Sequence, residues 1–130
     1  MWYGIGDKMR TIKFRGQRDD TKEWAYGYYW YDSMRNVHMI QNIEFHSSGW
    51  NSLVLAETVG QFTGLYDKNG IEIYEGDIIK AINEYNGGTN IGEVHFEDFT
   101  WFGAKDYLGY INNFCLIEVI GNIHDNKETL

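Results

Sequence analysis

The tetrapeptide Asp67-Lys68-Asn69-Gly70, with an apolar run on each side, is the feature that most constrains the fold of this chain. Two strand-like runs flank it, residues 61–66 before it and residues 71–74 after it. An Asn-Gly pair is preferred where a tight hairpin turn needs positive φ. The two runs are therefore predicted to pair antiparallel, with Asn69 at positive φ.

Further strand-like runs follow at short spacing along the whole chain, and helical periodicity is nowhere sustained for eleven residues. Residues 47–52 are predicted to form a loop, and residues 53–57 either a helical turn or the start of a strand. The sequence predicts a mainly β fold with little helix, in which short antiparallel hairpins form a sandwich or a small SH3-like barrel. The expected strands are residues 11–15, 24–31, 37–40, 43–45, 78–82, 91–96, 99–102, 107–111 and 115–120.

The expected organisation is a single β domain over residues 9–130, with an SH3-like sub-barrel at residues 74–123 as a further expectation. Residues 1–8 look like a flexible leader or an expression remnant, because Met9 opens a natural-looking start. No apolar run approaches the ~20 residues that cross a bilayer, so no membrane association is expected. The single cysteine, Cys115, lies in an apolar run and provides no disulfide framework.

The net charge of −8 is distributed unevenly along the chain. Residues 1–18 are net +4, whereas the chain from Asp19 onward has 6 Lys or Arg against 18 Asp or Glu. An acidic body repels nucleic-acid phosphates and favours a cationic partner, although solubility alone is the simpler explanation of net charge.

Motifs of nucleophilic catalysis and of phosphate binding are absent from the sequence. No G-x-S-x-G element occurs, Cys115 lies within an apolar strand, and Gly87-Gly88 is not followed by Lys-Ser or Lys-Thr. The chain is therefore expected not to be an enzyme and to use no cofactor.

Two groups of titratable residues are weaker candidates for chemistry. His95 and Glu97 lie two apart on one expected strand and would share a face, but two ligands do not make a metal site. Glu72, Glu75 and Asp77 could supply paired carboxylates for acid–base chemistry. The favoured interpretation of Asp77 is a hydrogen bond to the backbone of its turn.

One expected strand carries four large aromatic side chains at period two, Trp24, Tyr26, Tyr28 and Trp30. These rings would form a buried sheet face, or else a platform on which bases or sugars stack; burial is the favoured interpretation. Lys13 and Arg15 on a neighbouring strand would add the cations that such a platform needs. For the basic segment itself, docking on the acidic surface of its own or a neighbouring subunit is favoured over nucleic-acid contact.

Three segments together resemble the YopX family of phage and prophage proteins. The first is the long run TVGQFTGLYDKNGIEIYEGDIIK at residues 58–80, and the others are RTIKFR at residues 10–15 and EVIGNIHDN at residues 118–126. The resemblance implies a phage origin, a life in the cytoplasm of a bacterial host and a largely β fold, and it implies no activity or catalytic residues. Within the long run, Val59, Leu65, Ile73 and Ile78 are expected to be core.

Three functional hypotheses follow, each from a different class. The first is a non-enzymatic accessory protein that binds a host or phage protein through its acidic surface, with homo-oligomerisation as an added alternative. The second is a nucleic-acid-binding module built on the basic strand and the aromatic face. A third and weaker hypothesis is a hydrolase using Glu75, Asp77 or His95. The candidate binding surface comprises Lys13, Arg15, Trp24, Tyr26, Tyr28, Trp30, Glu72, Glu75 and Asp77.

Overall fold

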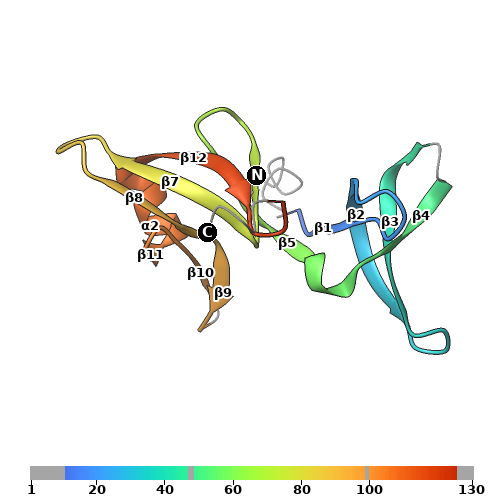
Figure 1. The fold of residues 1–130 in the computed structure, drawn as a ribbon. Helices are drawn as coiled ribbons and strands as arrows, with labels where there is room; N and C mark the ends of the chain where they lie inside the picture. Colours follow the sequence, from blue (N-terminus) through green and yellow to red (C-terminus); the bar gives the residue numbers. More distant parts are fainter. Residues whose placement is uncertain (1–10, 47–48, 99, 126–130) are drawn as a thin grey trace, which may run out of the picture. The chain divides into compact units, whose positions relative to one another are not determined.

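The computed structural model describes residues 11–46, 49–98 and 100–125. The expected leader at residues 1–8 lies outside these residues. The chain divides at Gly64 into two compact units, residues 1–64 and 65–130. Both consist mainly of antiparallel strands, and the part of the chain that is described contains one short α-helix (Figure 1), so the predicted fold class is confirmed.

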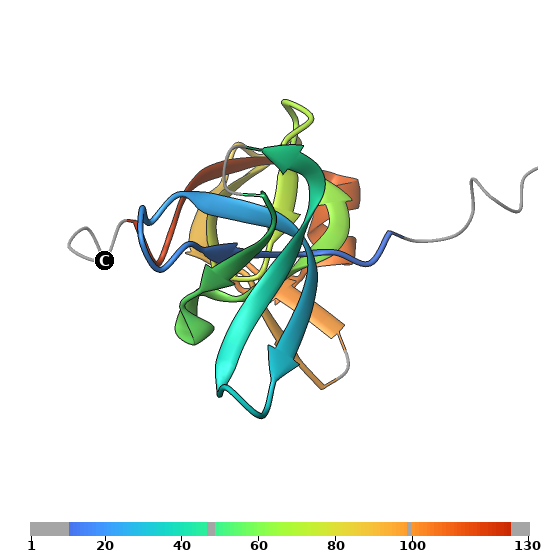
Figure 2. The same ribbon diagram turned by 90° about the vertical axis from the view of Figure 1, so that its right-hand side faces the viewer.

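The first unit is a curved antiparallel sheet with the strand order β4-β3-β2-β1-β5. Its longest strands, β2 and β3, lie side by side (Figure 2). In their register Gly27 lies opposite Asn42 and Asp32 lies opposite Val37. Its elements are β1 (Phe14–Gln17), β2 (Trp24–Asp32), β3 (Val37–His46), β4 (Gly49–Val54), the 3-10 turn η2 (Ala56–Thr58) and β5 (Gly60–Tyr66), which continues past Gly64.

The core of the first unit is small and is formed by one face of this sheet. Ala25, Ile40 and Val54 are buried in it, and Phe14, Tyr29 and Val59 pack against them. A single bridge between Arg18 and Val54 joins the end of β4 back to the residue after β1. The sheet therefore curls around its core.

Three boundaries in this unit differ from the expectations. β1 begins at Phe14 instead of Thr11, and the two short strands expected at residues 37–40 and 43–45 form one continuous strand, β3. The expected loop at residues 47–52 is wrong for residues 49–52, which belong to β4. Pairing overrides the polar composition there, because Asn51 and Ser52 lie opposite Gln41 and Ile40 in the ladder between β3 and β4.

The second unit contains two three-stranded sheets, ordered β12-β7-β8 and β11-β10-β9. The predicted hairpin of β7 and β8 is confirmed, and β7 also pairs antiparallel with β12. These sheets do not form a closed barrel, so the SH3-like alternative at residues 74–123 is wrong and the arrangement is sandwich-like. The elements are β6 (Glu72–Tyr74), β7 (Asp77–Asn83), β8 (Thr89–Glu93), β9 (His95–Glu97), β10 (Thr100–Gly103), β11 (Asp106–Tyr107), α2 (Leu108–Phe114) and β12 (Cys115–Asn122).

Residues 67–70 form the predicted turn, and β5 and β6 are neighbours in the sheet. The turn is organised by Asp67, whose Oδ1 accepts hydrogen bonds from the backbone N–H of Asn69 at 2.8 Å and of Ile71 at 2.9 Å. Gly70 has φ +80°, whereas Asn69 is not among the residues with positive φ. The expectation of positive φ at Asn69 is therefore wrong, because glycine takes the left-handed position and the Asp67 side chain stabilises the turn.

A larger core fills the second unit. Ile73, Ile79, Val94, Leu108 and Ile117 are among its fully buried members, and Leu65 packs against it. Ile73 and Ile78 are thus confirmed as buried, while Val59 and Leu65 are partly buried.

The strand expected at residues 107–111 is wrong. After Tyr107 the chain enters α2, where Leu108 and Ile111 are both buried and the residues between them are exposed. This spacing of three is the helical period, but seven residues are too few for it to be visible in the sequence.

No helix in the described ranges has the length and apolar character needed to cross a membrane.

Candidate functional site

The four aromatic residues at alternate positions of β2, from Trp24 to Trp30, do not form a buried face. Tyr26, Tyr28 and Trp30 are 42%, 58% and 39% exposed, while the alternate residues Ala25 and Gly27 are buried. A Cβ on Gly27 would lie 1.8 Å from the backbone oxygen of Gln41, so the inner face of β2 has no room for a larger side chain at this position. The expectation of burial is therefore wrong, because the large rings have to occupy the opposite face.

The two cations expected beside these rings are held against aromatic faces. The guanidinium carbon of Arg15 lies 4.4 Å from the centroid of the Trp24 ring, and Arg15 is only 6% exposed. Lys13 Nζ lies 5.4 Å from the centroid of the Phe62 ring. Cation–π contacts of this kind stabilise the sheet locally. A buried guanidinium is a poor contact for a nucleic-acid phosphate.

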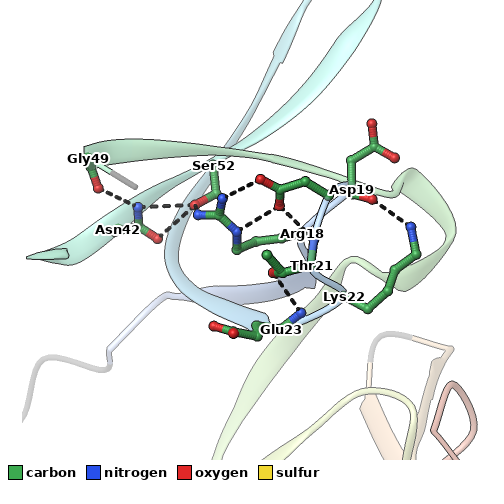
Figure 3. A network of polar contacts seen from close by, with 9 residues as sticks. Arg18, Asp19, Thr21, Lys22, Glu23, Asn42, Gly49 and Ser52 are labelled. Atoms are coloured by element: carbon green, nitrogen blue, oxygen red, sulfur yellow. Dashed lines mark hydrogen bonds and ion pairs between the residues drawn. The ribbon is translucent and has the colours of Figure 1, made fainter. Parts of the chain in front are cut away.

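A polar network that the sequence did not reveal surrounds Arg18, at the end of β1 (Figure 3). Arg18 binds Asp20 through two nitrogens, at 3.0 and 2.7 Å, and its Nη1 donates to Ser52 Oγ at 3.3 Å. The buried amide of Asn42 donates in turn to Ser52 Oγ and to the backbone oxygen of Gly49. The network spans 34 residues of sequence, so no local motif could have indicated it.

The function of the Arg18 network is structural. The backbone N–H of Asp19 donates to the oxygen of Leu53 at 3.0 Å, so the β1–β2 turn is attached to β4. Lys22, which has φ +64°, donates from Nζ to the oxygen of Asp19 at 2.6 Å (Figure 3). The hydrogen bond from Arg18 lowers the pKa of the exposed Asp20 carboxyl. These contacts define the turn and present no reactive group.

Two of the three acidic residues proposed for acid–base chemistry, Asp77 and Glu72, make hydrogen bonds within the fold. Asp77 is 1% exposed, and its Oδ2 accepts a 2.7 Å hydrogen bond from the backbone N–H of Tyr74. The interpretation of Asp77 as a turn residue is therefore confirmed. Glu72 Oε1 accepts from the Tyr74 hydroxyl at 3.0 Å, and Glu75 is half-buried.

His95 and Glu97 share a face of β9, as predicted. Their side chains lie 3.4 Å apart (Nε2 to Oε2), both well exposed, and the His95 ring stacks on Phe102 with centroids 5.3 Å apart. Within the described ranges, no group of three or more His, Cys, Asp or Glu side chains is placed to hold a metal ion. The pair forms a surface contact.

The net negative charge of the chain comes entirely from its second unit. Residues 1–64 contain seven Lys or Arg and seven Asp or Glu, whereas residues 65–130 contain four Lys or Arg and twelve Asp or Glu. Three exposed carboxylates follow one another on β8, β9 and the turn after β9: Glu93, Glu97 and Asp98, here called the acidic strip. Of these three, Glu97 has an ion-pair partner, the weakly basic His95. The strip is therefore open to a cationic ligand.

Comparison with known proteins identifies relatives over nearly the whole chain. The family described as YopX protein matches residues 13–130. A solved structure, described as "Crystal structure of protein EF1440 from Enterococcus faecalis", superposes with a TM-score of 0.61 at 26% sequence identity, covering 94% of this chain and 99% of that one. No curated protein matches the sequence.

Proposed function

The chain belongs to the YopX family, and from this premise we propose that it is a non-enzymatic accessory protein that binds a basic surface of a partner protein through the acidic strip. The partner is a host or phage protein, and the site of action is the host cytoplasm, in keeping with the phage and prophage membership of the family. The observation that carries the proposal is the concentration of the whole net charge in one unit.

Electrostatics gives this arrangement a direct consequence for binding. Clustered carboxylates raise the local concentration of cationic partners and speed association, and the effect weakens as salt screens it. The same field repels nucleic acid from the second unit. Glu93, Glu97 and Asp98 are exposed, so they can contact a partner without rearrangement.

The test is affinity capture from an infected host lysate, followed by measurement of binding to the captured protein at several salt concentrations. The variant Glu93→Gln, Glu97→Gln, Asp98→Asn removes three negative charges, and asparagine suits the positive φ of Asp98. Its control, Asp19→Asn, Glu23→Gln, Glu57→Gln, removes three exposed charges from the first unit. We expect the strip variant alone to lose at least tenfold in association rate and most of the salt dependence. Equal behaviour of the two variants would refute the proposal.

A second candidate function is binding of single-stranded nucleic acid on the outer face of β2, and one observation favours it: Tyr28 and Trp30 are exposed and available for stacking. Electrophoretic mobility shifts with single- and double-stranded DNA and RNA test this candidate. Binding that disappears in Tyr28→Ala, Trp30→Ala would support it, and no shift with any of the four probes would exclude it.

A further inference from the structure

A groove of about 520 Å³ lies in the second unit, lined by the β7–β8 hairpin, residues 104–106 and α2. This volume falls within the ~300–1,000 Å³ of ordinary small-ligand sites. None of the three residues of the acidic strip lines it. The groove is therefore a candidate site that is independent of the proposed protein contact.

Aromatic rings border the groove on two elements. Tyr85, in the β7–β8 turn, is 85% exposed, and Tyr110 and Phe114, one turn apart on α2, are 57% and 40% exposed. The Tyr110 and Phe114 rings lie 5.0 Å apart between centroids. Large exposed rings beside a concavity offer flat, electron-rich faces on which a ligand can stack.

The polar lining consists mostly of neutral amides and hydroxyls. Asn83 and Asn86 already accept hydrogen bonds from backbone N–H groups of their own turn. In the described part of the chain, the side chains of Thr89 and Asn90 make no hydrogen bond and remain able to donate and accept. An asparagine amide can bind two neighbouring hydroxyl groups at once, one through its oxygen and one through its nitrogen.

The wall at residues 104–106 is held in a strained conformation close to β8. Ala104 and Lys105 form the two-residue turn between β10 and β11, and their φ values of +49° and +77° are the positive values that a type I′ hairpin turn needs but that residues with a Cβ adopt at a cost. Gly92 permits the approach, because a Cβ there would lie 2.9 Å from the nitrogen of Ala104. The turn thereby brings its backbone against β8 and forms one wall of the groove.

The charge of the lining decides the class of ligand. Lys105 and Asp106 are its two charged residues, and their charges balance, although the second unit as a whole is strongly acidic. A phosphorylated ligand would be repelled by the field of the unit and would meet one lysine. We propose that the groove binds a neutral oligosaccharide, whose C–H faces stack on Tyr110 and Tyr85 and whose hydroxyl groups bind Asn90 and Thr89.

Calorimetric titration and amide chemical-shift mapping of the full chain with three neutral hexasaccharides, maltohexaose, cellohexaose and chitohexaose, test this proposal. We expect saturable binding of at least one, with shifts at residues 83–90 and 104–114. Tyr110→Ala should weaken binding roughly tenfold, as for the loss of one stacked ring. Tyr110→Phe, which keeps the ring, should bind within about twofold of wild type, because the face on which the sugar stacks is unchanged.

The matched control is Trp50→Ala, which removes a comparably exposed ring from β4 of the first unit and should leave sugar binding unchanged. Asn90→Ala provides a second variant, on β8, and should also weaken binding. Absence of saturable binding to all three sugars would overturn the proposal. Wild-type affinity in both Tyr110→Ala and Asn90→Ala would overturn it as well. So would tighter binding of adenosine, added as a separate ligand, than of any of the three sugars. None of these results depends on the acidic strip, so the two proposals can fail separately.

Discussion

Asp67 is the residue on which the β5–β6 turn depends. Its Oδ1 accepts from the N–H groups of Asn69 and Ile71, and its Oδ2 accepts from the N–H of Val119 on β12 at 3.0 Å. Burial opposes ionisation of this carboxyl, but the three backbone hydrogen bonds outweigh burial and hold the pKa of Asp67 below its ordinary value. The ionised form therefore stabilises the folded second unit.

Asp67→Asn is expected to destabilise the chain by about 1–3 kcal/mol at pH 7, because an amide has one acceptor and its NH₂ would face the N–H of Val119. The lowered pKa means that the contribution of Asp67 is complete above the unfolded pKa of about 3.9 and is lost as the pH falls through the folded pKa. Urea unfolding of both proteins at pH 7 and pH 3 measures the difference, which should shrink in acid. A difference that is constant with pH would show that the carboxylate charge is not involved.

Lys105 is the second residue whose own conformation should affect stability, because its backbone is strained. Its φ of +77° is easy for glycine and costly for lysine. Lys105→Gly is therefore expected to stabilise the chain by about 1 kcal/mol, seen as a higher urea midpoint at an unchanged m-value. Lys80→Gly serves as the control: Lys80 lies within β7 and is not at positive φ, so the same change should destabilise by about 1 kcal/mol. Destabilisation by both changes would argue against strain at Lys105.

At the scale of elements, β2 and β3 approach so closely that only glycine fits at one position. Gly27→Ala is expected to destabilise the first unit by at least ~3 kcal/mol, because its Cβ would overlap the carbonyl group of Gln41. The same substitution at Gly109, within α2, meets no atom within 4 Å and should stabilise the helix by about 0.5–1 kcal/mol. Thermal unfolding of the two alanine variants should thus shift in opposite directions. Similar shifts would show that position 27 accommodates a Cβ as easily as position 109 does.

The elements that could be predicted from the sequence are those with a local cause. The β7–β8 hairpin follows from the Asn86-Gly87-Gly88 turn between two apolar runs, and the β5–β6 turn follows from Asp67 to Gly70. Helix α2 could not be predicted, because its seven residues include a glycine and two aromatic residues that equally suit a strand.

The candidate sites were less predictable than the strands because they depend on contacts distant in sequence. The buried face of β2 is set by the approach of β3 at Gly27, and counting aromatic residues favoured the wrong face. The Arg18 network joins the turn after β1 to residues of β3 and β4 that no spacing rule connects. The groove arises where α2, which was missed, faces the end of a hairpin that was predicted.

The whole molecule combines two units that differ in charge and have separate cores. The first unit is neutral in formal charge and packs around Ile40, and the second has all the excess negative charge and packs around Ile79. Because each unit forms most of its contacts internally, the stability of each should depend on its own core.

Matched truncations of the two cores test this independence. Ile40 and Ile79 are both fully buried, so Ile40→Ala and Ile79→Ala should each cost about 2–5 kcal/mol by loss of apolar contacts and formation of a cavity. Native-state amide hydrogen exchange locates the loss. With Ile40→Ala, protection should fall in β2 and β3 and persist in β7 and β12, and with Ile79→Ala the pattern should reverse. If either variant lowers protection equally in both sets of strands, the two cores unfold as one cooperative structure.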